Sequence, residues 1–171
     1  MKIAFGYKMS SGKDTCVNYL IETRGGIKIA FADALYDILY YAQEICGFPK
    51  EKDRKFLQWI GTEWAREKNP QVWIELALRK SKELEKDNNV YCSDVRFLDE
   101  FYALKNDGWT LIKLNREKDE IYEKRIGTGK NNHRSENELD SLLDSEWDFI
   151  LDNNQTLEEL YIKLDKIIEK K

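Results

Sequence analysis

Residues 2–15 read KIAFGYKMSSGKDT, and this stretch decides the predicted fold. The apolar run 2–6 is typical of a short buried strand, and helical spacing begins at Lys13. Gly12, just before the helix, lets the backbone approach a ligand closely. Because a helix N-terminus carries unpaired N–H groups and a partial positive charge, such a loop can cradle phosphate groups. The stretch therefore predicts a strand, a phosphate-binding loop and a helix.

This loop departs at two positions from the usual pattern G-x-x-x-x-G-K-[ST]. Tyr7 holds the first glycine position, with Gly6 one residue earlier, and Asp14 stands where a magnesium-binding hydroxyl is expected. Asp14 either contacts the ion, directly or through water, or only complements the helix dipole. The alternative for the whole segment is an ordinary serine–glycine turn that caps a helix.

Strand and helix patterns alternate along the rest of the chain. Strands are expected at 27–31, 90–95, 109–114 and 147–151, with helical patterns at 33–45, 52–66, 97–106, 135–143 and 156–169, and another between Pro70 and Asn88. This order predicts one α/β domain over residues 1–171, with a five-stranded parallel sheet covered by helices on both faces. Ligands bind at the carboxyl ends of such strands, where Asp94, Arg96, Arg116 and Asn153 fall.

The composition fits a soluble globular protein and excludes several classes. Hydrophobic residues make up 42% and charged residues 35%, and the net charge of −4 argues against a general nucleic-acid binder. Three scattered cysteines and a single histidine argue against a structural zinc site. The sequence has neither a signal peptide nor an apolar run of membrane-spanning length. We expect a cytoplasmic protein that binds neither nucleic acid nor membranes.

Five segments together resemble one known family. They are GYKMSSGKDT (6–15), LQWIGTE (57–63), DVRF (94–97), HRSE (133–136) and the tail 147–160. The combination is similar to the bacteriophage-type deoxynucleoside monophosphate kinases, and it runs through nearly the whole chain. The resemblance implies a P-loop kinase fold with a small helical lid. It also implies transfer of the γ-phosphoryl group of ATP to a (deoxy)nucleoside monophosphate, with Mg²⁺.

On the ATP side, the chemistry requires alignment of two phosphates and neutralisation of charge. The expected catalytic residues are Lys13, Arg96, Arg116 and Arg125. The expected ATP-binding residues are Lys8, Met9, Ser10, Ser11, Gly12, Lys13, Asp14, Thr15, Arg116 and Asn153. Residues 116–136 resemble the lid, with Arg116 over the adenine and Arg125 moving onto the phosphates. Mg²⁺ is expected near Asp14, Thr15 and Asp94.

On the acceptor side, the expected wall comes from helices within residues 33–86. The expected residues are Asp33, Gln58, Thr62, Arg66, Trp73, Asp94, Arg96 and Arg134. Gln58, Thr62 and Arg66 are spaced by four and would share one face of a helix.

Several of these assignments have structural alternatives. Asp33 and Asp94 can cap helices, and Arg66 can be a solvated charge. Arg96 can pair with Glu100, and for Trp73 a place in the core is the favoured reading.

Two other functions remain open from the sequence. The fold can serve a kinase of another phosphorylated acceptor, such as dephospho-coenzyme A or phosphomevalonate. It can also serve a nucleotide-binding switch that has no acceptor. The sequence is silent on oligomeric state, although small kinases of this kind can pair through an exposed helix, which allows a homodimer.

Overall fold

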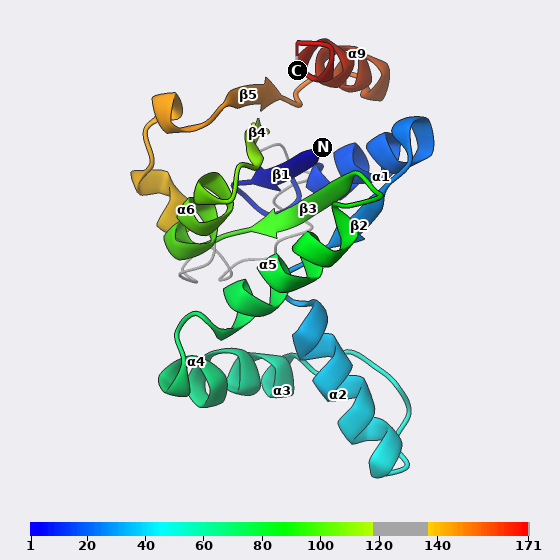
Figure 1. Cartoon of the computed structure of the whole chain (residues 1–171), viewed down its shortest axis with the longest axis vertical. Coiled ribbons are helices and arrows are strands. Elements are labelled where there is room, and N and C mark those ends of the chain that lie inside the picture. The colour runs from blue at the N-terminus through cyan, green and yellow to red at the C-terminus, as the bar shows by residue number, and fades with distance from the viewer. Residues whose placement is uncertain (118–136, 171) are drawn as a thin grey trace.

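The computed structural model describes residues 1–117 and 137–170, and these form a three-layer α/β fold (Figure 1). The strands are β1 (Lys2–Gly6), β2 (Ile27–Ile29), β3 (Val90–Val95), β4 (Thr110–Asn115) and β5 (Phe149–Asp152). They pair in parallel in the order β2-β3-β1-β4-β5. The predicted fold class, a parallel five-stranded sheet with helices on both faces, is therefore confirmed. The predicted lid lies largely outside the described residues.

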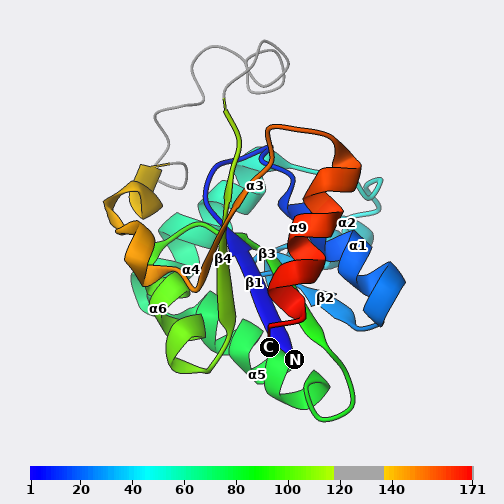
Figure 2. The same cartoon turned by 90° about the horizontal axis from the view of Figure 1, so that it is seen from above.

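Alternating side chains along the central strand separate two hydrophobic cores. Ile3 and Phe5 face helices α1 (Lys13–Arg24) and α9 (Leu157–Ile168), whereas Ala4 faces the opposite core. That opposite core is covered by α5 (Val72–Leu84) and α6 (Leu98–Asn106), which lie across the sheet from α1 and α9 in Figure 2. Because both faces are buried, the strands read as nearly continuous apolar runs.

The chain order places a ligand-binding crevice at the end of β1. From β1 the chain passes through α1 to the edge strand β2, whereas from β3 it passes through α6 to β4 on the other side of β1. The carboxyl end of β1 is thus the point where the direction of winding reverses, which is where such sheets bind ligands. The glycine loop begins at this point.

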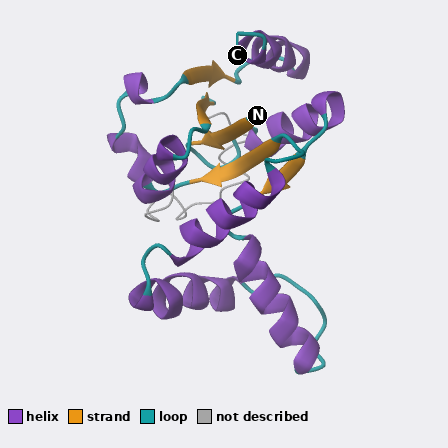
Figure 3. Ribbon diagram, in the orientation of Figure 1, coloured by secondary structure: helices purple, strands orange, loops and turns teal. Residues whose placement is uncertain are grey.

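A helical arm, defined here as residues 33–68, extends beyond the sheet (Figures 1 and 3). It contains α2 (Asp33–Ile45), α3 (Arg54–Gln58), a π-helical segment η1 (Trp59–Trp64) and α4 (Ala65–Lys68). Residues 54–68 are therefore helical without a break, which confirms the helical stretch predicted at 52–66, although its middle is π-helical. Asp53 caps α3 by accepting from Phe56 N at 3.0 Å, so the helix begins at Arg54 instead of residue 52.

The π-helical segment has a tertiary cause. The indole N–H of Trp73 donates to the carbonyl of Gly61 at 2.9 Å. In an α-helix that carbonyl would accept from Ala65 N, which instead donates to Ile60 O, five residues back. A side chain on another helix thus breaks the regular pattern.

The second strand ends at Ile29 instead of residue 31, and further differences from the predicted elements lie near the C-terminus. The predicted helix 135–143 is present, in its described part, as the short 3₁₀ helix η3 (Glu138–Ser141), and η4 (Asp144–Glu146) follows. The fifth strand begins at Phe149 because Trp147 is a core residue, packed against Phe101 with ring centroids 4.7 Å apart. In the part of the chain described, every helix is too short or too polar to cross a bilayer.

Gly6 is expected to be intolerant of a side chain. A Cβ atom there would lie 2.6 Å from Trp147 Cη2 and 3.3 Å from Val95 Cβ. We expect Gly6→Ala to lower the free energy of unfolding by about 2 kcal/mol through overpacking. Urea unfolding measures this loss. Trp147→Phe should restore much of it in the double variant, because the smaller ring leaves space and Trp147 Nε1 has no hydrogen-bond partner among the described residues. Equal losses in the single and double variants would contradict the overpacking explanation.

Candidate functional site

The loop between β1 and α1 has an unusual backbone. Tyr7 has φ 95°, Ser10 φ 59° and Gly12 φ 104°, so two non-glycine residues adopt the left-handed region. Tyr7 holds the first glycine position of the phosphate-loop pattern and keeps a glycine-like conformation. Its ring lies under the ammonium of Lys113, 4.3 Å from the centroid, and packs on the core. Packing of the ring and the positive φ thus accommodate tyrosine at the position where the usual pattern has glycine.

Two side chains hold this loop in place through hydrogen bonds. Lys13 is 7% exposed, and its ammonium donates to the carbonyls of Tyr7 and Lys8 and to Ser11 Oγ. Asn153, after β5, donates from Nδ2 to Ser11 O at 2.8 Å. A Cβ at Gly12 would lie 2.6 Å from that same Nδ2, so glycine is required there both by φ and by space. These contacts fix the loop around the amino end of α1.

The loop borders a cavity of about 460 Å³, named here the loop pocket. Its polar lining combines the end of the loop, the start of α1 and two arginines from other strand ends. The lining residues are Met9, Ser10, Gly12, Lys13, Asp14, Thr15, Arg96, Arg116, Asn153, Gln155, Leu157 and Leu160. The cavity thus joins a helix N-terminus to positive side chains, a combination that suits a polyphosphate.

Asp14 has two partners that the sequence analysis missed. Ser93 Oγ and Lys28 Nζ each donate to Asp14 Oδ1 at 2.6 Å. Burial works to raise the pKa of Asp14, but the hydrogen bonds from Lys28 and Ser93 outweigh it and hold the pKa below its ordinary value. Asp14 is therefore an anion over the usual pH range. In the usual arrangement the loop provides a hydroxyl and the neighbouring strand a carboxylate. Here the loop provides the carboxylate of Asp14 and β3 provides the hydroxyl of Ser93.

A second cavity, of about 540 Å³, lies between the helical arm and the ends of β2 and β3 and is named here the arm pocket. Aromatic rings, two amide or hydroxyl side chains and four cations line it. The lining residues are Met9, Phe31, Ala32, Leu35, Tyr36, Lys52, Arg54, Leu57, Gln58, Thr62, Arg66, Trp73, Asp94, Arg96, Phe97 and Glu100. The arm pocket is lined by all three residues expected on one helix face, Gln58, Thr62 and Arg66. The helix that carries them is not a regular α-helix, because residues 59–64 are π-helical.

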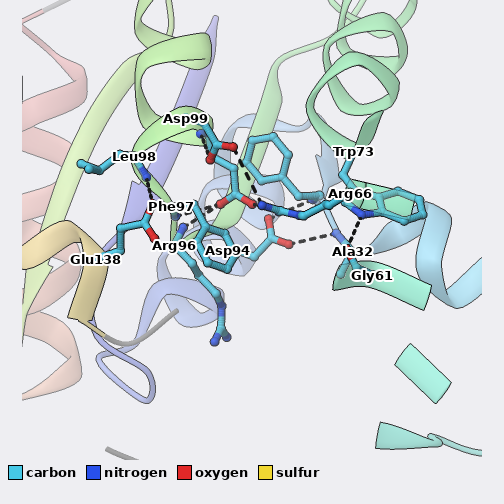
Figure 4. Close-up of polar contacts among 12 residues, drawn as sticks. Ala32, Gly61, Arg66, Trp73, Asp94, Arg96, Phe97, Leu98, Asp99 and Glu138 are labelled. Atoms are coloured by element: carbon cyan, nitrogen blue, oxygen red, sulfur yellow. Dashed lines mark hydrogen bonds and ion pairs between the residues drawn. The ribbon is translucent and has the colours of Figure 1, made fainter. Parts of the chain in front are cut away.

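Arg66 and Glu100 form the buried polar centre of the arm pocket (Figure 4). Arg66 donates from Nη2 to Glu100 Oε1 at 3.2 Å, and its guanidinium carbon lies 4.5 Å from the centroid of the Phe97 ring. Burial and the neighbouring carboxylate of Asp94 raise the pKa of Glu100 to about 8, against the opposing effect of Arg66 and of the Arg96 and Phe97 N–H groups. The sequence alone indicates Glu100 only as an alternative partner for the side chain of Arg96.

Asp94 lies in the arm pocket and is absent from the lining of the loop pocket. Its two oxygens accept from Phe31 N at 3.1 Å and Ala32 N at 3.2 Å, which ties the end of β2 to the end of β3 (Figure 4). Burial raises the pKa of Asp94, and the hydrogen bonds from Cys92, Phe31 and Ala32 act against this rise.

Met9 and Arg96 line both the loop pocket and the arm pocket, so the two cavities meet at these side chains. Arg96 follows β3 directly, and its backbone N–H and that of Phe97 donate to Glu100 Oε2. Trp73 lines the arm pocket but is only 3% exposed, which agrees with the expected place in the core. A molecule in the arm pocket and a phosphate chain in the loop pocket would face each other across Arg96.

Some expected site residues lie elsewhere. Asp33 lies in the first turn of α2 without capping it, and it lines a different cavity, where its carboxylate accepts from Ala30 N at 3.1 Å and from Lys80 Nζ at 2.8 Å. Lys8 pairs with Asp140 at 2.6 Å, and Ser11 is buried with its hydroxyl on Lys8 O. Neither lines the loop pocket. Arg125 and Arg134, with lid residues 118–136, lie outside the described residues.

Solved structures show the class of fold to which this arrangement belongs. A dephospho-CoA kinase from Campylobacter jejuni matches with a TM-score of 0.54 and 20% identity over 99% of this chain and 97% of that one. A shikimate kinase from Acinetobacter baumannii, in complex with shikimate, matches with a TM-score of 0.51 and 18% identity over 99% and 93%. The fold is that of the P-loop kinases. At these identities the likeness concerns the fold alone.

Sequence relatives are more specific. The chain is 29% identical over 191 residues to a protein of Acanthamoeba polyphaga mimivirus described as "Putative deoxynucleotide monophosphate kinase", covering 93% of this chain and 91% of that protein. It is 35% identical over 148 residues to "Uncharacterized protein ORF77" of Ictalurid herpesvirus 1, and spans 60% of that protein's length. No family model matches the sequence. The resemblance to the deoxynucleoside monophosphate kinases is thus confirmed by a relative that is matched over 93% of this chain.

Proposed function

We propose that this protein is a kinase that transfers the γ-phosphoryl group of ATP to the phosphate of a (deoxy)nucleoside monophosphate. The observation that carries the proposal is the sharing of Met9 and Arg96 by the loop pocket and the arm pocket. Two cavities that meet at an arginine suit two phosphates that must be brought into line. The mimivirus homologue supports the choice of substrate.

The arm pocket has the composition that a nucleotide acceptor requires. Phe31, Tyr36 and Trp73 offer apolar and aromatic walls for a base, and Gln58 can read a base edge with a paired donor and acceptor. Arg66 and Arg96 offer planar guanidinium groups that can bind phosphate oxygens through two N–H groups. A volume of about 540 Å³ lies in the range of small-molecule sites.

In the proposed mechanism the loop holds the donor and the arm holds the acceptor. Backbone N–H groups of the loop and the Lys13 ammonium bind the β- and γ-phosphates, and Arg116 covers the donor side. Arg96, between the pockets, stabilises the charge of the transferring group, and Arg66 holds the acceptor phosphate. Residues 116–136 are proposed as the lid and carry Arg125 onto the phosphates.

The residues around Asp14 fit Mg²⁺ held mainly by phosphates and water. Among the described residues, no three acidic, cysteine or histidine side chains gather into a metal site. Mg²⁺ in phosphoryl-transfer sites needs only one or two protein ligands, because phosphate oxygens and water supply the others. Asp14, an anion whose Oδ1 is held by Ser93 and Lys28, and the hydroxyl of Thr15 would hold the ion. The ion would neutralise charge on the transferring phosphates.

A coupled assay of ADP formation tests the proposal. The panel contains dAMP, dCMP, dGMP, dTMP, AMP and CMP, with dephospho-coenzyme A, phosphomevalonate and shikimate as rival acceptors. We expect ADP formation that depends on at least one nucleoside monophosphate. Turnover with a rival acceptor and with no nucleotide would overturn the proposed substrate class. Slow ATP hydrolysis that no acceptor changes would instead indicate a nucleotide-binding switch.

A further inference from the structure

Glu100 is a buried carboxyl group at the junction of two arginines. It is 2% exposed and lies in the first turn of α6. Oε2 accepts from the backbone N–H groups of Arg96 at 2.9 Å and Phe97 at 3.1 Å, while Oε1 accepts from Arg66 Nη2 at 3.2 Å. The two oxygens therefore have different tasks. One fixes the backbone that carries Arg96, and the other holds the side chain of Arg66, which comes from the helical arm.

Arg66 is held on three sides within the arm pocket (Figure 4). Besides the bond to Glu100, its Nη1 lies 3.8 Å from Asp99 Oδ2, and the ring of Phe97 lies against the guanidinium plane at 4.5 Å. A free arginine side chain has about 2 kcal/mol of rotamer entropy to lose on binding. Holding it in advance removes much of that cost from the binding of a phosphate. The side chain is 20% exposed, so its remaining surface faces the pocket.

We infer that Glu100 is the positioning residue of the arm pocket, which orients the Arg66 guanidinium and fixes the Arg96 backbone so that both arginines converge on the acceptor phosphate. This inference rests on the proposed function. Because the pKa of Glu100 is raised to about 8, the group carries little negative charge beside the phosphate site at neutral pH. The position of Glu100 is explained by its contacts with the Arg66 guanidinium and the Arg96 backbone. Asp94 and Asp99 are the other carboxylates that face this cluster, and both have their own backbone N–H partners.

Glu100→Gln separates the two tasks of the residue. The glutamine carbonyl oxygen can still accept from Arg96 N and Phe97 N, so the start of α6 keeps its cap. The amide NH₂ then faces Arg66 Nη2, and because both groups are donors the Arg66 contact is lost. We expect the KM for the acceptor to rise about 10- to 100-fold, with the KM for ATP within about twofold of wild type. Asp99→Asn, which removes a more exposed partner, should raise the acceptor KM far less.

A double-mutant cycle shows whether Glu100 acts through Arg66. Arg66→Met should raise the acceptor KM as Glu100→Gln does, and the double variant should match Arg66→Met within about twofold. Multiplied effects in the double variant would overturn the inference, as they would show independent actions. An equal rise of the KM for ATP in Glu100→Gln would also overturn it, because general damage to the fold would then be the cause.

A second readout needs no substrate and so separates this inference from the proposed function. The Nε–H signal of Arg66 in a ¹⁵N-arginine-labelled protein is assigned by its loss in Arg66→Met. We expect a distinct, exchange-protected signal in wild type and Asp99→Asn, and an averaged signal in Glu100→Gln. A protected signal that persists in Glu100→Gln would overturn the inference. If wild type shows the protected signal but turns over no nucleotide, the proposed function fails while the positioning of Arg66 stands.

Discussion

Replacing Lys13 by alanine is expected to lower turnover by about 10³-fold, which is the size of effect seen when a preorganised group that stabilises charge in a transition state is removed. The ammonium has two roles in this account. It faces the loop pocket, and it ties together the loop through the carbonyls of Tyr7 and Lys8. Alanine removes the positive charge and leaves those buried carbonyls without their donor, so ATP binding should weaken as well.

Steady-state kinetics and ATP titration measure the two losses separately. Lys82→Ala is the matched control, because Lys82 lies on α5, has a side chain that is 64% exposed, and lines neither pocket. It should leave both quantities unchanged. A thermal melt of Lys13→Ala shows whether the fold persists. Normal ATP binding by a folded Lys13→Ala protein would contradict the assignment of the loop as the phosphate site.

The second large effect concerns stability and pH. Because the pKa of Glu100 is raised to about 8 in the folded protein, from an ordinary value of 4.5, the folded state keeps a proton that the unfolded state releases. The stability from this group is fully present below pH 4.5 and is lost as the pH rises through about 8. Glu100→Gln cannot release a proton. We therefore expect its unfolding free energy, relative to wild type, to rise by on the order of 4 kcal/mol between pH 5 and pH 9.

Urea unfolding of wild type and Glu100→Gln at both pH values measures this difference directly. Carboxyl groups with lowered pKa values, such as Asp14 and Asp165, are present in both proteins, so their effects cancel in the comparison. Parallel pH curves for Glu100→Gln and wild type would contradict the raised pKa.

The sheet and the loop could be predicted because their causes are local. β1, α2 and β3 have the bounds that their residue patterns indicate, since each apolar run is buried and each turn is marked by glycine or polar residues. The loop was recognisable from Gly12 and Lys13, although Tyr7 and Asp14 depart from the usual pattern. The convergence of Gln58, Thr62 and Arg66 followed from their spacing, even though the helix that carries them is not regular.

What could not be predicted depends on contacts between distant segments. The π-helical segment follows from the bond of Trp73 to Gly61, and the environment of Asp14 from Ser93 and Lys28 on neighbouring strands. The carboxylate of Asp33 pairs with Lys80 on α5 and does not line the arm pocket. Glu100 carried one signal that was available in the sequence, its position three residues after Phe97, which is typical of a carboxylate that bonds back to the start of a helix. Its second partner, Arg66, came from tertiary structure.

The transfer of labelled γ-phosphate from ATP tests the central claim most directly. The protein is incubated with Mg²⁺, ATP labelled in its γ-phosphate and the nucleoside monophosphate that the panel selects, and the products are separated. We predict that the label appears in the nucleoside diphosphate, and that Lys13→Ala abolishes its appearance. Label found in inorganic phosphate alone, at a rate that the monophosphate does not change, would contradict the account.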